Sequence, residues 1–152
     1  MMIEGVRTKS LKLIPDERGW LMEMLRNDDP VFLKFGQIYA TATYPGVVKG
    51  WHLHRVQVDN FVCVAGMVKL VMYDPREGSS TRKEVNEFFI GDRNPLLVQV
   101  PAGVYHGWKC ISTETAVVIN CPTELYHYEK PDEVRLDAHS DQVPYDWARK
   151  ER

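Results

Sequence analysis

Short apolar stretches, broken at regular intervals by turn-forming residues, run through almost the whole chain. Pro and Gly occur together at 44–46 and 101–103, and clusters of this kind separate strands more often than helices. Between the turns, side chains alternate in character, so that Val68, Leu70 and Met72 share one face of an extended segment. This spacing predicts an all-β sandwich or barrel. The predicted strands are 6–14, 20–26, 37–43, 47–53, 60–64, 68–73, 83–90, 96–100, 106–110 and 116–120.

Two segments depart from the strand pattern. One short helix is predicted over 29–35, because Pro30 would lie in its first turn and Gly36 just beyond its end. The charged tail after Glu129 contains two prolines and is predicted to be irregular. We expect it to wrap back over the barrel, with Trp147 as an anchor.

Length and charge restrict the class of protein. A chain of 152 residues suits a single domain, 1–152, with a real core. The net charge of −2 provides no basic field for nucleic acid, so no nucleic-acid partner is expected. No apolar run approaches the length that crosses a bilayer, and the first residues do not resemble a secretion signal. We therefore expect no membrane partner and a cytoplasmic location.

Four polar residues mark the candidate site. His52 and His54 are two residues apart in a predicted strand, so their side chains project to the same face. Asp59 follows in the next predicted turn, and His106 comes soon after a Pro-x-Gly turn. Imidazoles on the inner face of a barrel indicate either a metal site or acid–base chemistry on a bound small molecule.

The spacing of these residues resembles the two motifs of the cupin superfamily. The first is Gly46-x5-His52-x-His54-x4-Asp59-x6-Gly66, and the second is Pro101-x-Gly103-x2-His106. The resemblance implies a double-stranded β-helix, which is a jelly-roll barrel of two antiparallel sheets. In metal-binding cupins the matching residues, here His52, His54, Asp59 and His106, hold a transition metal.

A closer resemblance covers nearly the whole chain. It is to the nucleotide-sugar epimerase branch of the cupins, typified by dTDP-4-dehydrorhamnose 3,5-epimerase. Five motifs of that family occur here in the same order. They are Asp16-x-Arg18-Gly19-x3-Glu23, Gly46-Val-Val-Lys-Gly-Trp-His52, Asp74-Pro-Arg76-x-Gly78-Ser-x-Thr81, Asn94 with Leu96 to Trp108, and Thr123-x2-Tyr126.

The resemblance implies a reaction without redox cofactor or metal. The substrate is a nucleotide-diphosphate-linked 4-keto-6-deoxyhexose, whose ketone acidifies the protons on C3 and C5. His52 matches the base that removes a proton, and Tyr126 matches the acid that returns one to the opposite face. A carboxylate from the C-terminal segment is expected to orient the histidine, with Asp137 as the first candidate and Asp141 as the second.

The same resemblance implies a homodimer in which the N-terminal strand contributes residues to the partner's site across the interface.

The resemblance also assigns substrate-binding roles. Arg18 and Lys49 match positions that bind the diphosphate, and Glu23 and Gln37 match positions that contact nucleotide or sugar. The remaining substrate-binding candidates are His54, Asp59 and His106 in the sugar pocket and Trp108, which could stack on the base as Trp20 could.

One departure from the family leaves the function open at this point. The family has Gln-x-Lys after the catalytic histidine, and that lysine stabilises the enolate oxygen. Here the stretch reads Gln57-Val-Asp59, and an ionised carboxylate cannot stabilise an enolate. Three hypotheses therefore stand. The protein is an epimerase, a metal-dependent cupin that uses the four-residue set, or a non-catalytic cupin that binds sugar nucleotides.

Overall fold

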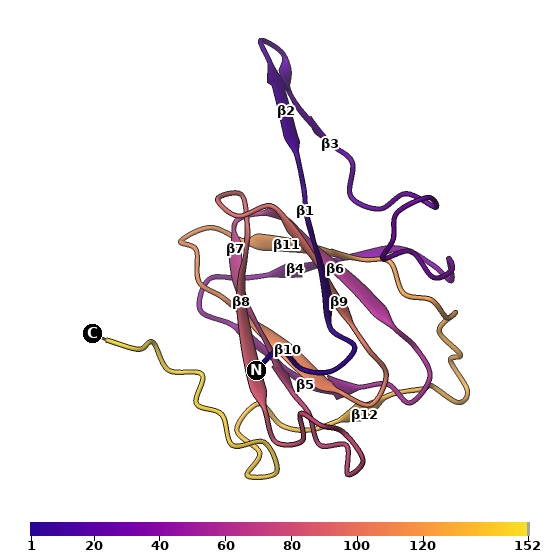
Figure 1. The fold of residues 1–152 in the computed structure, drawn as a ribbon. Coiled ribbons are helices and arrows are strands. Elements are labelled where there is room, and N and C mark those ends of the chain that lie inside the picture. The colour runs from indigo at the N-terminus through magenta and orange to yellow at the C-terminus, as the bar shows by residue number, and fades with distance from the viewer. Residues whose placement is uncertain (152) are drawn as a thin grey trace.

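The computed structural model describes residues 1–151, which contain twelve strands and no helix. Ten strands form two five-stranded antiparallel sheets, and the remaining two form a separate hairpin (Figure 1). The strands are β1 Arg7–Ser10, β2 Leu13–Asp16, β3 Gly19–Met22, β4 Tyr39–Thr43, β5 Val48–Leu53, β6 Asp59–Ala65, β7 Met67–Tyr73, β8 Val85–Gly91, β9 Leu96–Val100, β10 Tyr105–Cys110, β11 Ala116–Asn120 and β12 Val134–Arg135.

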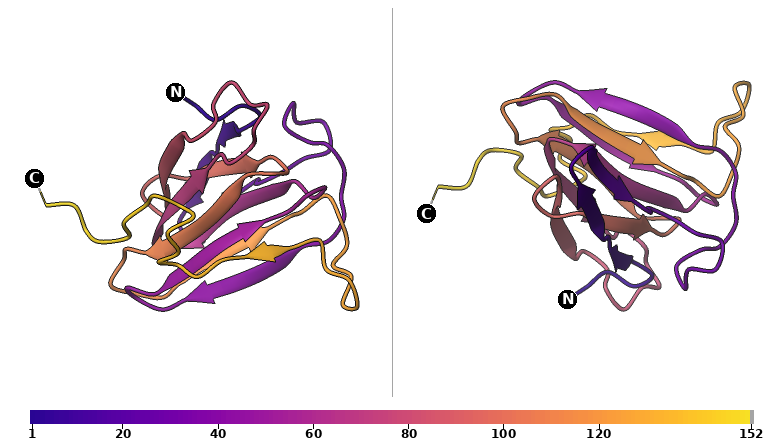
Figure 2. Two further views of the ribbon diagram at one scale, coloured as in Figure 1. Left: turned by 90° about the horizontal axis from the view of Figure 1, so that it is seen from below. Right: turned by 90° about the horizontal axis from the view of Figure 1, so that it is seen from above.

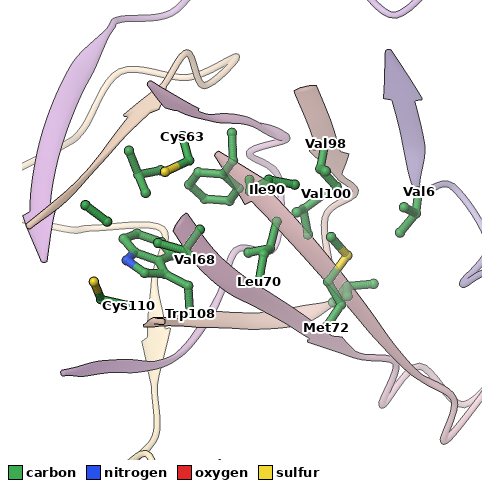
Figure 3. Packing of buried hydrophobic residues seen from close by; sticks show 14 of the residues in the cluster. Val6, Cys63, Val68, Leu70, Met72, Ile90, Val98, Val100, Trp108 and Cys110 are labelled. Carbon is green, nitrogen blue, oxygen red and sulfur yellow. The ribbon is translucent and has the colours of Figure 1, made fainter. Parts of the chain in front are cut away.

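The two large sheets stack as the layers of a jelly-roll barrel, and Figure 2 shows them from below and above. Their strand orders are β1-β9-β6-β11-β4 and β12-β5-β10-β7-β8. Apolar side chains from both inner faces fill one end of the space between the layers, among them Leu70, Met72, Val98 and Val100 (Figure 3). The double-stranded β-helix expected from the sequence is confirmed.

The C-terminal segment wraps over the outer face of the second sheet, as predicted. Trp147 is buried with its ring 5.0 Å from that of Trp51, a β5 residue whose side chain points away from the barrel interior. Both indole N–H groups donate to the carbonyl of Ala138, at 3.3 Å from Trp51 and 3.0 Å from Trp147. Along the way the segment forms β12, which pairs with β5 and was not predicted.

The β2–β3 hairpin projects away from both sheets (Figure 1). The predicted strand 6–14 therefore splits into two, because the chain leaves the first sheet after β1 and enters the hairpin at β2. Ile14, Trp20 and Leu21 on this hairpin are 46%, 54% and 58% exposed. Apolar side chains this exposed on a projecting element are typical of a surface that a partner covers.

The helix predicted over 29–35 was wrong. This segment forms turns and then runs extended. The Asp29 carboxylate accepts the backbone N–H of Arg26 and the ammonium of Lys9, which fixes a tight turn instead of a first helical turn. The backbone N–H of Gly36 donates to the carbonyl of Pro122 at 2.9 Å, so the end of the segment is tied to a distant part of the chain. No helix long and apolar enough to cross a bilayer occurs in residues 1–151.

Candidate active site

A cavity of about 790 Å³ opens between the two sheets and borders the apolar core, because Phe61 and Trp108 of the core form part of its lining. Strands β4, β5, β6 and β10 and the segment that leads into β12 provide its walls. Polar and aromatic groups predominate in the lining. They are Gln37, Ile38, Tyr39, Thr41, Lys49, His52, His54, Gln57, Phe61, His106, Trp108, Tyr126, Tyr128, Glu133 and Arg135.

A β-bulge in the β5–β10 pairing decides which side chains of β5 face this cavity. His52 pairs with His106, whereas Lys49 pairs with Trp108, so the register shifts by one residue between them. Regular alternation would put Lys49 and His52 on opposite faces, but the bulge lets both line the cavity. Glycine is required on both strands here. A Cβ on Gly50 would lie 2.7 Å from the Ala138 Cα, and one on Gly107 would lie 2.7 Å from the Lys49 carbonyl oxygen.

His52 lies beside a carboxylate that sequence reasoning missed. Its Nε2 is 3.8 Å from Oε1 of Glu133, and the guanidinium of Arg135 holds that carboxylate through two N–H donors at 2.8 and 2.7 Å. Burial lowers the pKa of His52, and the charge of Glu133 opposes this in part. The imidazole is therefore neutral near pH 7, which is the state that a general base requires.

His54 and His106 converge on Asp59, which is buried just behind the cavity wall. Their Nε2 atoms lie 3.5 and 3.4 Å from the same carboxylate oxygen, Oδ2. The other oxygen accepts amide N–H groups from Gln57 and Asn120, both at 2.8 Å. Burial lowers the pKa of His106 to about 4, so this imidazole is neutral at physiological pH. Asp59 itself is not part of the cavity lining, and its contacts are with protein groups.

The arrangement bears on the metal alternative. The ligand atoms of His54, Asp59 and His106 lie within 4.8 Å of one another, which is close enough for one ion. His52 is not part of this group, so the predicted set of four ligands is reduced to three. His52 instead lies with its ring centre 6.1 Å from that of His106, next to Glu133.

Several other predicted site residues lie at the cavity. Tyr126 is on its rim, and its backbone N–H donates to the side-chain oxygen of Gln37 at 3.3 Å. The ring of Tyr126 lies 5.2 Å from that of Tyr128. Trp108 forms part of the floor, where its indole N–H donates to the Thr43 hydroxyl at 2.9 Å and its ring packs on Phe61. Trp108 is buried, so little of its face is open to a nucleotide base.

Besides Asp59 behind the cavity wall, three predicted site residues lie outside the cavity. Arg18 and Glu23 are exposed at the β2–β3 hairpin and beyond it, where each pairs with a neighbour in sequence, Arg18 with Asp16 and Glu23 with Arg26. Asp137 is also exposed, and its carboxylate accepts the backbone N–H of His139. Within one chain, the carboxylate beside His52 is therefore not Asp137.

Glu133 left a weak signal in the sequence. Glu133 and Arg135 are two residues apart, so an extended segment would place both side chains on one face. That segment is only two residues long as a strand and follows Pro131, so it resembles an irregular tail. Only its pairing with β5 brings these two charges next to His52.

The sequence profile of the dTDP-4-dehydrorhamnose 3,5-epimerase family matches residues 1–152. The chain belongs to this family. A probable low-salt glycan biosynthesis epimerase of Haloferax volcanii is 42% identical over 147 residues, which cover 95% of this chain and 94% of the relative. The spore coat polysaccharide biosynthesis protein SpsL of Bacillus subtilis is 34% identical, with 96% and 97% covered.

Solved structures agree with this assignment. The crystal structure of a dTDP sugar isomerase from Desulfovibrio desulfuricans superposes with a TM-score of 0.93 at 30% identity, covering 98% of this chain and 94% of the other. The family assignment makes the protein an isomerase of the epimerase type, and it does not favour the metal-dependent alternative.

The contact between Glu133 and His52 leads to a test that does not depend on activity. Glu133→Gln removes a negative charge beside the imidazole, so the pKa of His52 should fall further below its ordinary value. NMR titration of the histidine ring signals measures this pKa directly. Asp137→Asn is the matched control, and it should leave the pKa of His52 unchanged because Asp137 lies outside the cavity. An unchanged His52 pKa in Glu133→Gln, or a shift in Asp137→Asn, would contradict this placement.

Proposed function

We propose that this protein inverts a stereocentre next to the ketone of a nucleotide-diphosphate-linked 4-keto-6-deoxyhexose. The observation that carries the proposal is a neutral imidazole, His52, which faces a cavity large enough for a sugar and lies beside the Glu133 carboxylate. Membership of the dTDP-4-dehydrorhamnose 3,5-epimerase family supports the substrate class.

The proposed chemistry needs two proton transfers and no change in oxidation state. His52 takes the proton from the carbon next to the ketone, and the electron pair of that C–H bond moves onto the carbonyl oxygen to form an enolate. Tyr126 then gives its phenolic proton to the opposite face of the same carbon, and the carbonyl re-forms. Glu133 stabilises the imidazolium that appears on His52 in the first step. Solvent restores both groups to their starting states.

The charges of the cavity support a diphosphate-linked substrate. Lys49 of β5 and Arg135 of β12 line it from one sheet and can face an anionic group. Gln37 and Tyr39 line it from the side of β4, where they can form hydrogen bonds to nucleotide or sugar. The family has arginine at the position of Lys49. An ammonium group keeps the positive charge but cannot form the bidentate contact with phosphate that a guanidinium forms. Arg135 brings a guanidinium to the same cavity.

We also propose that a second copy of the chain completes the site. Arg18 and Glu23, which match substrate-binding positions of the family, lie at or next to a hairpin that projects from its own barrel (Figure 1). A partner could receive this hairpin at its cavity, and burial of Trp20 and Leu21 would help to hold the two chains together.

Sedimentation equilibrium tests this arrangement. The wild-type chain should have the mass of two chains, and Leu21→Asp should weaken the association because it places a charge in the proposed interface. A wild-type chain that sediments with the mass of one chain would contradict the proposal.

The whole chain, 1–152, acts in this account as one epimerase domain, as the extent of the family match supports. The two relatives described above take part in glycan and spore coat polysaccharide biosynthesis. We propose a similar role in polysaccharide or glycan biosynthesis, in the cytoplasm, where nucleotide-linked sugars are made.

The reaction is tested by proton NMR with dTDP-4-keto-6-deoxyglucose in D2O. Wild type should exchange the C3 or C5 proton for deuterium and also invert the carbon. Tyr126→Phe should still exchange, because His52 can return a deuteron to the face from which it took the proton, but it should not invert. Tyr128→Phe is the matched control, since this ring neighbours Tyr126, and it should behave as wild type. Inversion at the wild-type rate in Tyr126→Phe would exclude Tyr126 as the acid.

A further inference from the structure

A second cavity, of about 490 Å³, lies on the outer face of the sheet that contains β7, β8 and β10, beneath the C-terminal segment. The proposed reaction uses none of the residues around it. Its walls are partly apolar, with Phe89, Ile111 and the buried Trp147 among them. Three lysines also line it, Lys69 from β7, Lys109 from β10 and Lys150 from the tail.

Lys69 is unusual among these because it is largely buried and its ammonium group faces aromatic rings rather than a carboxylate within hydrogen-bonding distance. The residue is only 6% exposed, and within residues 1–151 its ammonium group makes no hydrogen bond or ion pair. Its nearest stabilising contacts are the aromatic faces of Tyr145 and Trp147, whose ring centres lie 5.2 and 5.8 Å from Nζ. Burial lowers the pKa of Lys69, the charge of Glu87 opposes this in part, and the neighbouring ammonium of Lys109 lowers it further.

A second lysine lies directly opposite. Lys69 and Lys109 are cross-strand partners in the antiparallel β7–β10 pair, and like charges in this position destabilise a sheet. The ammonium of Lys109 donates to the backbone carbonyl of Trp147 at 3.0 Å, a contact that leaves its positive charge in place. An anion bound between the two ammonium groups would reduce their mutual repulsion.

The local charge balance indicates what kind of anion fits. Glu87 is the carboxylate of the cavity wall, and it already accepts the Tyr145 hydroxyl and the ammonium of Lys150 at 2.8 Å. With Lys150 matched by Glu87 and Arg149 by Glu151, the charges of Lys69 and Lys109 remain. A phosphate monoester carries between about −1.5 and −2 charges near pH 7, which matches two ammonium groups.

We propose that this cavity is a second ligand site, which binds the phosphoryl group of a small organic phosphate between Lys69 and Lys109 and its apolar part against Phe89 and Ile111. The site lies across the sheet from His52, because the side chains of neighbouring residues of β5, Trp51 and His52, point to opposite faces. A ligand here would bind the face that the C-terminal segment covers and would leave the proposed catalytic cavity open.

Calorimetric titration and thermal unfolding of the full chain test this site with two probes, phenyl phosphate and inorganic phosphate, at constant ionic strength set with sodium chloride. Wild type should bind phenyl phosphate more tightly than inorganic phosphate, because only the former has an apolar part, and its Tm should rise with added ligand. Lys69→Met should bind phenyl phosphate at least about tenfold more weakly, since a charged partner is lost from a largely buried contact.

Lys69→Met should also unfold at a higher temperature than wild type in buffer without phosphate, because it removes one of two like charges that face each other across β7 and β10. Lys109→Met should likewise weaken phenyl phosphate binding. Lys12→Met, which removes an exposed lysine, is the control and should bind phenyl phosphate as wild type does. Unchanged binding in Lys69→Met, equally weakened binding in Lys12→Met, or no binding to wild type would overturn the proposal.

Discussion

The structure depends on the opposed faces of one strand, β5. Trp51 points outward and His52 points into the barrel. These two neighbouring residues therefore place the outer apolar cluster and the proposed catalytic cavity on opposite faces of the same strand. Trp147 covers Trp51, and full burial of an indole contributes on the order of 5 kcal/mol before the entropy of ordering is counted. The same segment forms β12 and carries Glu133 to His52. Burial on one face of the sheet therefore helps to position Glu133 beside His52 on the other.

The three histidines of the cavity differ in the exposure of their side chains, and therefore in how easily a ligand can contact them. The side chain of His106 is 3% exposed and that of His54 is 11% exposed, whereas that of His52 is 28% exposed. Nδ1 of His54 and of His106 contacts a backbone carbonyl, from Asp132 and Val104 respectively, while Asp59 lies beside the Nε2 atoms of both rings. His52 is thus the imidazole most open to a substrate. Because Asp59 lies behind the cavity wall with its oxygens facing Gln57, Asn120, His54 and His106, its presence where the family has lysine does not line the cavity with a carboxylate.

Much of the fold was predictable because strand alternation and turn residues are local signals. β9 and β11 were predicted to the residue, and the spacing of His52 and His54 correctly placed both on one face. Long-range contacts determined what the sequence could not predict. The turn at Asp29 depends on Lys9, and Glu133 reaches His52 only through a two-residue strand. Gly50, beside the bulge, is approached closely by the backbone of Ala138, a contact between segments far apart in the sequence.

The family resemblance had a similar limit. It matched cavity residues where the chain forms regular strands, such as Lys49 and His106, but it chose Asp137 as the orienting carboxylate in a segment that aligns poorly. Arg18 and Glu23 fall outside the cavity of their own chain, because their places depend on a second copy in the proposed arrangement. Residues whose position is set within one sheet were thus easier to assign than those set by the tail or by a partner.

The central claim is that His52 removes the proton next to the ketone. The most direct measurement compares His52→Ala with His139→Ala, an exposed histidine outside the cavity, in the rate of deuterium uptake by dTDP-4-keto-6-deoxyglucose. The account predicts that His52→Ala loses about 10²-fold or more of the exchange rate but still binds dTDP, and that His139→Ala matches wild type. Exchange at the wild-type rate in His52→Ala would contradict the account.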